Sequence, residues 1–240
     1  NEILDFSKIE AGKLTMEKTE FWLNEVMDNL ANLIGIKAEE KGLELLFQVP
    51  PDVPCALIGD PLRLGQILIN LANNAVKFTS VGSVDLEVRH DRDSAGADVV
   101  SFEVRDTGQG IPRDRLESIF DPFVQAKAGQ DGTGLGLAIA HRLVGLMGGA
   151  LTVTSIVGEG SRFRFAIPMQ AVSENWDAVT RVAPPEPAPA ELTALIVDDS
   201  DASRALLGRQ VARLGVPHRA VASGAEALDA LSHRVRYTSV

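Results

Sequence analysis

The residues best suited to chemistry lie in an asparagine-rich segment. Asn70 and Asn74 are four residues apart, so on a helix they share one face, and Lys77 lies near that face one turn later. An amide oxygen is a hard ligand suited to Mg²⁺, and we therefore predict Asn74 as a metal ligand. Lys77 would bring a positive charge to phosphates, and Asn70 could orient the transferring group or its attacker. The competing interpretation is a polar helix face with a lysine at its edge.

Asp106 follows an alternating run at residues 99–104, which predicts a strand that ends in a loop. A carboxylate there can accept a hydrogen bond from the amino group of adenine, a donor that guanine lacks at that position. Gly108 and Gly110 would let the backbone approach the base or sugar without a Cβ in the way. Asp106 is therefore predicted to read adenine, while a simple turn that binds nothing is the alternative.

A glycine-rich run at residues 132–136 leads into a helical pattern at 137–144. Such a loop presents N–H groups and the positive end of a helix dipole to phosphate oxygens. The residues predicted to hold the triphosphate are Gly132, Thr133, Gly134, Leu135 and Gly136. The spacing differs from the phosphate loop, and no strand precedes it as in a dinucleotide fingerprint. The three segments together predict a site for ATP and Mg²⁺.

The order of these motifs resembles the ATP-binding catalytic domain of sensor histidine kinases, over roughly residues 1–172. The motifs that carry the resemblance are residues 70–78, 106–110, Phe120-Asp121-Pro122-Phe123 and 132–136, with further matches at 59–66, 146–149 and 158–163. The resemblance implies the Mg²⁺ role for Asn74, the adenine role for Asp106, and a mobile lid over ATP at residues 121–136. Phe120 and Lys127 are implied as further nucleotide contacts. The lid departs from the family, because it is short and Lys127 is its one cation between Phe123 and Gly132, which puts contact with the γ-phosphate in question.

The opening residues 1–13 resemble the end of the second helix of that family's dimerisation hairpin, with Gly12 near the helix stop. The resemblance implies a homodimer in the full-length protein and a phosphoacceptor histidine upstream of Asn1. The histidines that are present lie in no matching motif, and they are His90, His141, His218 and His233.

Composition sets limits on these interpretations. A length of 240 residues allows one full domain and part of another, and 45% hydrophobic residues suffice for real cores. The net charge of −10 and the pI near 4.9 argue against binding of nucleic acid. The single cysteine, Cys55, excludes a disulfide within the chain and suits the reducing cytosol, and we expect it to be buried or half-buried. With no long apolar run, we expect a cytoplasmic fragment whose parent reaches a membrane only through upstream segments.

A proline-rich stretch at residues 181–190 predicts an extended linker, which we place at 173–190. Beyond it, an apolar strand at 192–197 ends in Asp198 and Asp199, and a helix, a short strand and a second helix follow. This order is the βαβα start of a doubly wound, flavodoxin-like fold. Residues 191–240 resemble the receiver domain of response regulators, with Asp198 and Asp199 as the acidic Mg²⁺ pair. An aspartate pair that only caps a helix is the alternative.

In that family the phosphoacceptor aspartate ends the third strand. Residues 237–240 resemble the beginning of that strand, so the acceptor is expected beyond Val240.

The predicted fold is a two-layer α/β sandwich at residues 21–172, preceded by the hairpin end at 1–20. The strands of its mixed sheet are expected near residues 43–49, 83–90, 98–105, 150–156 and 161–167, and helices near 24–41, 61–78 and 135–147 should cover one face. A kinase core followed by a receiver implies a hybrid histidine kinase, which passes the γ-phosphoryl of ATP to a histidine, then to an aspartate, and on to a phosphotransfer or response-regulator protein. One alternative is a pseudokinase that senses nucleotide without phosphotransfer. Another is a motion-driving ATPase of the same fold, which the hairpin and receiver disfavour.

Overall fold

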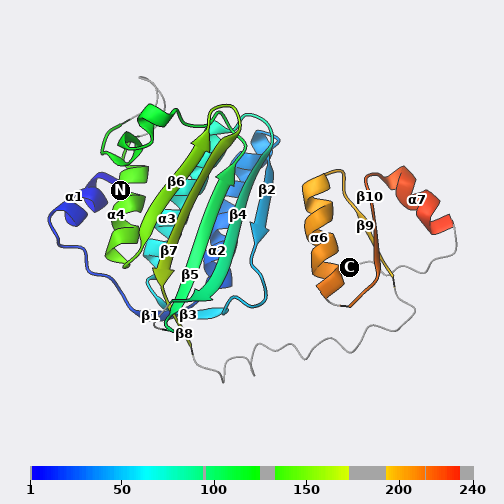
Figure 1. Cartoon of the computed structure of the whole chain (residues 1–240), viewed down its shortest axis with the longest axis horizontal. Coiled ribbons are helices and arrows are strands. Elements are labelled where there is room, and N and C mark those ends of the chain that lie inside the picture. The colour runs from blue at the N-terminus through cyan, green and yellow to red at the C-terminus, as the bar shows by residue number, and fades with distance from the viewer. Residues whose placement is uncertain (1, 94–95, 125–132, 173–192, 214, 233–240) are drawn as a thin grey trace. The chain divides into compact units, whose positions relative to one another are not determined.

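The computed structural model describes residues 2–93, 96–124, 133–172, 193–213 and 215–232. The chain folds into two compact units, Asn1–Ser173 and Glu174–Val240, and each is described by itself (Figure 1). The predicted linker at residues 173–190 lies outside the described residues, as do Lys127, Gly132 and the expected third strand at 237–240.

Five strands of the first unit form one mixed sheet, and three helices cover one face of it (Figure 1). The strands follow in the order β2 (Glu44–Gln48), β4 (Ser83–Arg92), β5 (Asp98–Asp106), β7 (Gly160–Pro168) and β6 (Ala150–Ile156). β2 pairs parallel with β4, and the other pairs are antiparallel. The covering helices are α2 (Leu23–Glu40), α3 (Pro61–Phe78) and α4 (Gly136–Leu146). The predicted two-layer α/β sandwich is confirmed.

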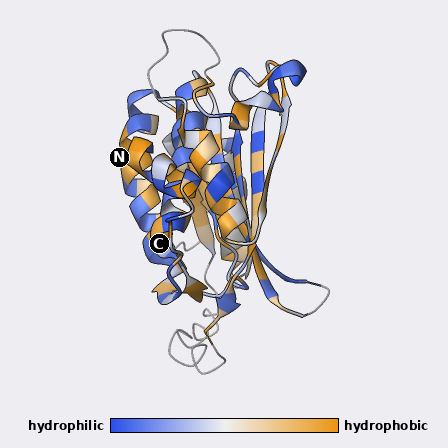
Figure 2. Cartoon of the chain, turned by 90° about the vertical axis from the view of Figure 1, so that its left-hand side faces the viewer, coloured by the Kyte–Doolittle hydropathy of each residue, from blue (hydrophilic) through white to orange (hydrophobic). Residues whose placement is uncertain are grey.

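The core lies between this sheet and its helices. On β4, Val84, Leu86 and Val88 are buried, while the residues between them face away from the helices and are partly exposed. Phe102 of β5 stacks on Phe165 of β7 with ring centroids 5.0 Å apart. The helices carry both hydrophobic and hydrophilic residues around their axes, as expected for elements with one buried face (Figure 2). Truncating Phe102 to alanine would therefore cost about 3–5 kcal/mol.

A second, small sheet closes one end of the unit, and it was not predicted. Its order is β1 (Thr19–Trp22), β3 (Ala56–Gly59) and β8 (Gln170–Ala171), all antiparallel. Strands of four, four and two residues are too short to show an alternating pattern. Cys55, just before β3, is exposed, so the expectation of burial was wrong. The backbone carbonyl of Cys55 accepts a hydrogen bond from the N–H of Leu23 at 2.8 Å.

The helix that carries the asparagines begins at a defined cap. Asp60 is buried, and its carboxylate accepts the N–H groups of Arg63 and Glu17, each at 3.0 Å. Pro61 occupies the first helical position, where its missing N–H costs nothing. Asp60 thus starts α3 and fastens the segment that follows α1 to the same point.

The opening helix α1 (Glu2–Glu10) ends two residues before Gly12, which the sequence placed near its stop. Gly12 has φ 63° and donates to the carbonyl of Ile9 at 3.0 Å, while Lys13 donates to Lys8 at 2.9 Å. Between β5 and α4 the chain forms two 3-10 turns, η1 (Arg113–Arg115) and η2 (Ser118–Phe120). Within the described residues, no helix is both long and apolar enough to cross a bilayer.

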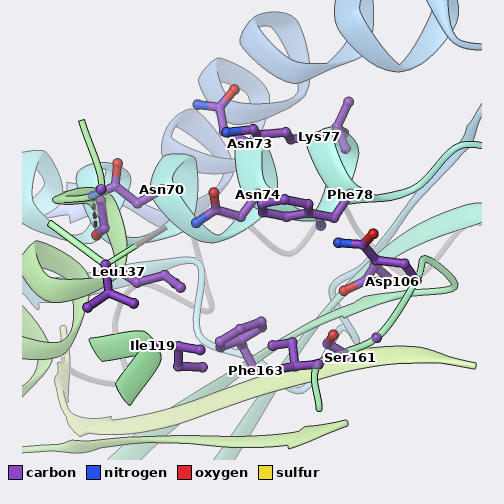
Figure 3. A pocket seen from close by; sticks show the side chains of 18 of the residues that line it. Asn70, Asn73, Asn74, Lys77, Phe78, Asp106, Ile119, Leu137, Ser161 and Phe163 are labelled. Atoms are coloured by element: carbon purple, nitrogen blue, oxygen red, sulfur yellow. Dashed lines mark hydrogen bonds between the residues drawn. The ribbon is translucent and has the colours of Figure 1, made fainter. Parts of the chain in front are cut away.

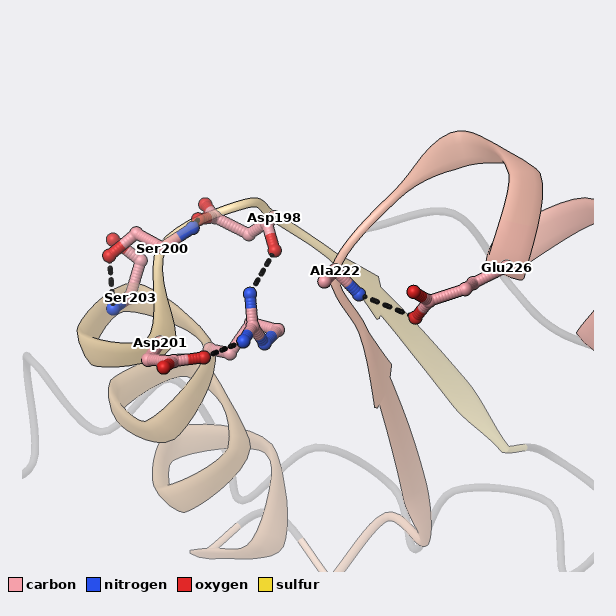
Figure 4. Close-up of polar contacts among 7 residues, drawn as sticks. Asp198, Ser200, Asp201, Ser203, Ala222 and Glu226 are labelled. Carbon is pink, nitrogen blue, oxygen red and sulfur yellow. Dashed lines mark hydrogen bonds and ion pairs between the residues drawn. The ribbon is translucent and has the colours of Figure 1, made fainter.

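The second unit has the predicted βαβα order. Parallel strands β9 (Ala194–Val197) and β10 (His218–Val221) alternate with α6 (Asp201–Arg213) and α7 (Gly224–Ser232). Helix α7 begins at a side-chain cap, since Ser223 Oγ accepts the N–H of Glu226 at 3.2 Å. The Glu226 carboxylate in turn accepts the N–H of Ala222 at 3.0 Å (Figure 4). Local sequence signals therefore account for the start of this helix.

Candidate functional site

A cavity of about 750 Å³ in the first unit gathers most of the residues singled out in the sequence. Its walls come from α3, from the start of α4, and from the ends of β5 and β7 (Figure 3). The volume falls within the range of about 300–1,000 Å³ that small-molecule and cofactor sites occupy. Apolar side chains at Phe78, Ile119, Leu137 and Phe163 and a polar wall from α3 face the same space (Figure 3).

The polar wall consists of Asn70, Asn74 and Lys77, which α3 presents at successive turns (Figure 3). The Asn70 side chain donates from Nδ2 to the carbonyl of Gly136 at 3.0 Å, so it joins α3 to the first residue of α4. Lys77 Nζ lies 5.2 Å from the centroid of the Phe78 ring. The site therefore presents amide groups and a cation on one face, as the spacing predicted.

The donor set suits a magnesium ion that brings its own phosphate ligands. Asn74 offers a hard amide oxygen to the cavity. In the part of the chain that the structure describes, no cluster of three or more His, Cys, Asp and Glu residues could hold a metal. An ion here would take the rest of its shell from phosphates and water, which is usual for Mg²⁺ in nucleotide sites.

Asp106 lies at the opposite end of the cavity, only 5% exposed. Its Oδ1 accepts the N–H of Gly108 at 2.8 Å, and Ser161 of β7 adds hydrogen bonds from its backbone and side chain. Burial raises the pKa of Asp106, while the hydrogen bonds from Gly108 and Ser161 oppose that rise. A carboxylate has about four acceptor positions, so these donors leave room for one from a ligand.

The loop beside Asp106 is packed against the β6–β7 hairpin. A Cβ on Gly110 (φ 71°) would lie 2.1 Å from the carbonyl oxygen of Ile156, and one on Gly160 (φ 110°) would lie 2.0 Å from that of Asp106. The N–H of Gly158 donates to the carbonyl of Gln109 at 2.9 Å. Glycine is thus required here for close contact between two backbone segments.

The other end of the cavity is the start of α4, where Thr133, Gly134 and Gly136 line it. The Thr133 hydroxyl accepts the N–H of Leu135 at 3.2 Å, and the carbonyl of Gly134 accepts the N–H of Phe123 at 3.0 Å. The first N–H groups of a helix have no partner within the helix and favour an anion. This end has the chemistry to bind phosphate oxygens.

Some residues predicted for the site lie elsewhere. Of the described ones, Gly108, Phe120 and Leu135 are outside the cavity lining, and Leu135 is fully buried behind it. Phe120 stacks on His141 of α4 with ring centroids 4.8 Å apart, while its neighbour Ile119 reaches the cavity. Asp198 and Asp199 belong to the second unit.

Sequence reasoning missed several contributors. Ser161 hydrogen-bonds Asp106, and Lys37 and Arg115 line the cavity as further cations. Lys37 Nζ donates to Asn73 Oδ1 at 2.8 Å. Lys41 Nζ donates to the backbone carbonyls of residues 76, 77 and 79 at 2.7, 3.0 and 3.3 Å, and so caps the end of α3. Isolated charges such as these carry no motif, and only the tertiary structure brings them to the site.

In the second unit, Asp198 follows β9 directly (Figure 4), and Asp199 comes next in the sequence. Asp198 Oδ1 accepts the N–H of Ser200 at 2.8 Å, and the carbonyl of Asp198 accepts Arg204 Nη1 at 2.6 Å. Arg204 also pairs with Asp201, and Asp199 is exposed. Asp198 therefore shapes the turn into α6.

Comparisons with known proteins give consistent findings. Residues 59–171 match the family model "Histidine kinase-, DNA gyrase B-, and HSP90-like ATPase". The sensor histidine kinase RcsC of Escherichia coli is 45% identical over 174 residues, which are 70% of this chain and 18% of RcsC. The signal transduction histidine-protein kinase BarA of E. coli is 43% identical over 171 residues, 70% of this chain and 19% of BarA. The chain thus spans less than a fifth of the length of these relatives.

Two solved structures are also similar to this chain. The crystal structure of full-length ShkA in complex with AMPPNP is similar with a TM-score of 0.76 and 34% identity, over 95% of this chain and 46% of that one. The catalytic domain of the histidine kinase ThkA is 31% identical with a TM-score of 0.54, over 64% of this chain and 96% of that one.

Proposed function

Because the chain belongs to the histidine kinase-, DNA gyrase B- and HSP90-like ATPase family and contains the ATP-binding catalytic domain of a histidine kinase, we propose that it transfers the γ-phosphoryl group of ATP to a histidine. The observation that carries the proposal is a single cavity with an adenine-type acceptor, Asp106, at one end and a helix start at the other. The amide and lysine side chains of α3 lie between them. This order matches the order of groups in a nucleoside triphosphate.

Each residue then has a defined task. Asp106 accepts a hydrogen bond from the adenine amino group, supported by the donors that already hold its carboxylate. Lys77 and the start of α4 at Thr133, Gly134 and Gly136 balance the charge of the phosphates. Asn74 provides an amide oxygen for Mg²⁺, which supplies charge neutralisation when it is bound. Asn70, fixed by its bond to Gly136, orients the transferred group.

The remaining predicted contacts extend the same proposal. Gly108, Gly110, Phe120 and Leu135 shape the backbone around the nucleotide, and Lys127 and Gly132 would contribute from the lid. Because Lys127 is the single cation of that segment, Lys37 and Arg115 at the cavity provide charge that the lid lacks.

The proposed context is a hybrid kinase of a phosphorelay. Helix α1 would be the end of a dimerisation hairpin whose first helix carries the phosphoacceptor histidine, in a cytosolic homodimer. The βαβα order of the second unit supports a receiver, with Asp198 and Asp199 as its Mg²⁺ pair and a further aspartate as acceptor. A phosphotransfer or response-regulator protein would take the phosphoryl group onward, with no role for nucleic acid.

The short lid favours one alternative, a pseudokinase whose ATP site only sets conformation. A version of the chain extended through a complete hairpin distinguishes the two when incubated with γ-labelled ATP. The kinase acquires label that is stable to alkali and lost in acid, as for phosphohistidine, and Asn70→Ala abolishes it. A pseudokinase binds the nucleotide and acquires no label.

A further inference from the structure

One contact at the nucleotide site has no part in the function proposed above. The Thr133 hydroxyl, at the start of α4, donates a hydrogen bond to the carboxylate of Glu2 from α1. The two residues are 131 positions apart in the sequence, and both line the cavity. An acidic side chain therefore accepts the hydrogen bond of a hydroxyl group that lies at the phosphate-binding end of the site.

Thr133 is tied to the phosphate end by its own geometry. Its hydroxyl oxygen accepts the N–H of Leu135 at 3.2 Å, which places it beside the first turn of α4. The hydroxyl hydrogen is then available for donation, and the carboxylate of Glu2 accepts this hydrogen bond. A carboxylate oxygen and a phosphate oxygen are both anionic acceptors, so both are stabilised by a hydroxyl donor and by the positive end of a helix dipole.

Helix α1 reaches this position through a small set of contacts. The Phe6 ring meets the Phe123 ring edge-on at 6.2 Å, and Glu10 pairs with Arg142 of α4 at 3.2 Å. Gln66 of α3 donates to Asp5 at 3.1 Å. None of the residues of α1 is fully buried, and exposed ion pairs contribute only about 0–1 kcal/mol each. Phe6 and Ile9 also pack against the hydrophobic core, so α1 places Glu2 at the cavity, while the hydrogen bond between Glu2 and Thr133 itself is exposed.

We propose that Glu2 is a built-in competitor of the nucleotide phosphates. Without nucleotide, its carboxylate binds the Thr133 hydroxyl and adds a negative charge where the polyphosphate must bind. This inference rests on the proposed ATP site and adds its regulation. Since coupling between two binding events is reciprocal, ATP weakens the contact of Glu2 with Thr133, and a change that draws Glu2 away tightens ATP binding.

The test is calorimetric titration of the chain with AMPPNP and Mg²⁺, and separately with adenosine, which has no phosphates. Glu2→Gln keeps the shape of the side chain and removes its charge. We expect it to bind AMPPNP about fivefold more tightly, the equivalent of an exposed charged pair of about 1 kcal/mol. Its affinity for adenosine should equal that of the wild type.

Two matched Glu→Gln variants separate the possible causes. Glu10→Gln weakens the docking of α1 through Arg142 and leaves Glu2 charged, and Glu40→Gln removes another carboxylate that lines the cavity without a bond to Thr133. Glu10→Gln should bind AMPPNP more tightly than the wild type but by less than Glu2→Gln, because it loosens α1 and leaves the charge of Glu2 in place. Glu40→Gln should bind AMPPNP within about twofold of the wild type. Unchanged or weaker AMPPNP binding by Glu2→Gln, an equal gain for adenosine, or an equal gain in Glu40→Gln would each overturn the proposal. Failure of the folded wild type to bind AMPPNP would instead count against the ATP site itself.

Discussion

Gly110 offers a quantitative test of how the adenine end of the site is built. Its φ of 71° costs a residue with a Cβ about 1–2 kcal/mol, and that Cβ would lie 2.1 Å from the carbonyl oxygen of Ile156. No side chain can tolerate that distance, so the loop at residues 106–110 must move away from the β6–β7 hairpin. Overpacking of this kind adds about 1–3 kcal/mol, which gives about 2–5 kcal/mol for Gly110→Ala.

Gly158 provides the matched control, because it has φ 86° and open space where its Cβ would be. Gly158→Ala should therefore cost only the conformational part, about 1–2 kcal/mol. Urea unfolding gives both free energies, and titration with AMPPNP shows whether the shifted loop weakens binding in Gly110→Ala alone. Equal losses of stability and affinity in the two variants would refute the close contact between loop and hairpin.

Two further predictions concern single charges. Burial raises the pKa of Asp85, a hydrogen bond from Ser83 opposes the rise, and Oδ1 of Asp85 is buried without a hydrogen-bond partner among the described residues. The ionised carboxylate thus costs stability at neutral pH, so Asp85→Asn should gain up to about 1 kcal/mol there. Urea unfolding should show this gain shrinking as the pH falls through the raised pKa of Asp85 and absent below the ordinary carboxyl pKa of about 4. Lys41→Met removes the ammonium that caps three carbonyls at the end of α3 and should lower the free energy of unfolding by about 1–2 kcal/mol. The control, Lys37→Met, loses one exposed hydrogen bond to Asn73 and should cost less than about 1 kcal/mol. Equal losses on urea unfolding would contradict the capping role of Lys41.

The elements with strong local signals were predictable. Helix α3 was expected at residues 61–78 and occupies Pro61–Phe78, because the Asp60 cap, Pro61 and a regular apolar face all mark the same boundaries. The long strands of the main sheet alternate, so their inward and outward faces follow from the sequence. The small sheet was missed because β1 gains its stability from β3, about 40 residues away, and has little pattern of its own.

In the candidate site, too, the residues with a local sequence pattern were predictable and those placed by tertiary contacts were not. Asn70, Asn74, Lys77 and Asp106 were predictable because motif spacing on a helix or at a strand end fixes their direction. The stacking of Phe120 on His141 depends on how a short turn packs against α4, which no local pattern encodes. The same holds for Glu2, which bonds to Thr133, a residue 131 positions away in the sequence.

The most direct test of the account is titration of the chain with AMPPNP in the presence and absence of Mg²⁺, alongside Asn74→Ala and Asp106→Asn. The account predicts binding that Mg²⁺ strengthens, a loss of that Mg²⁺ effect in Asn74→Ala, and about tenfold or weaker binding in Asp106→Asn, since a lost hydrogen bond to a charged group costs about 1.5–3 kcal/mol. A guanine analogue should not compete. No binding by a chain that circular dichroism shows to be folded, or equal binding of adenine and guanine nucleotides, would contradict it.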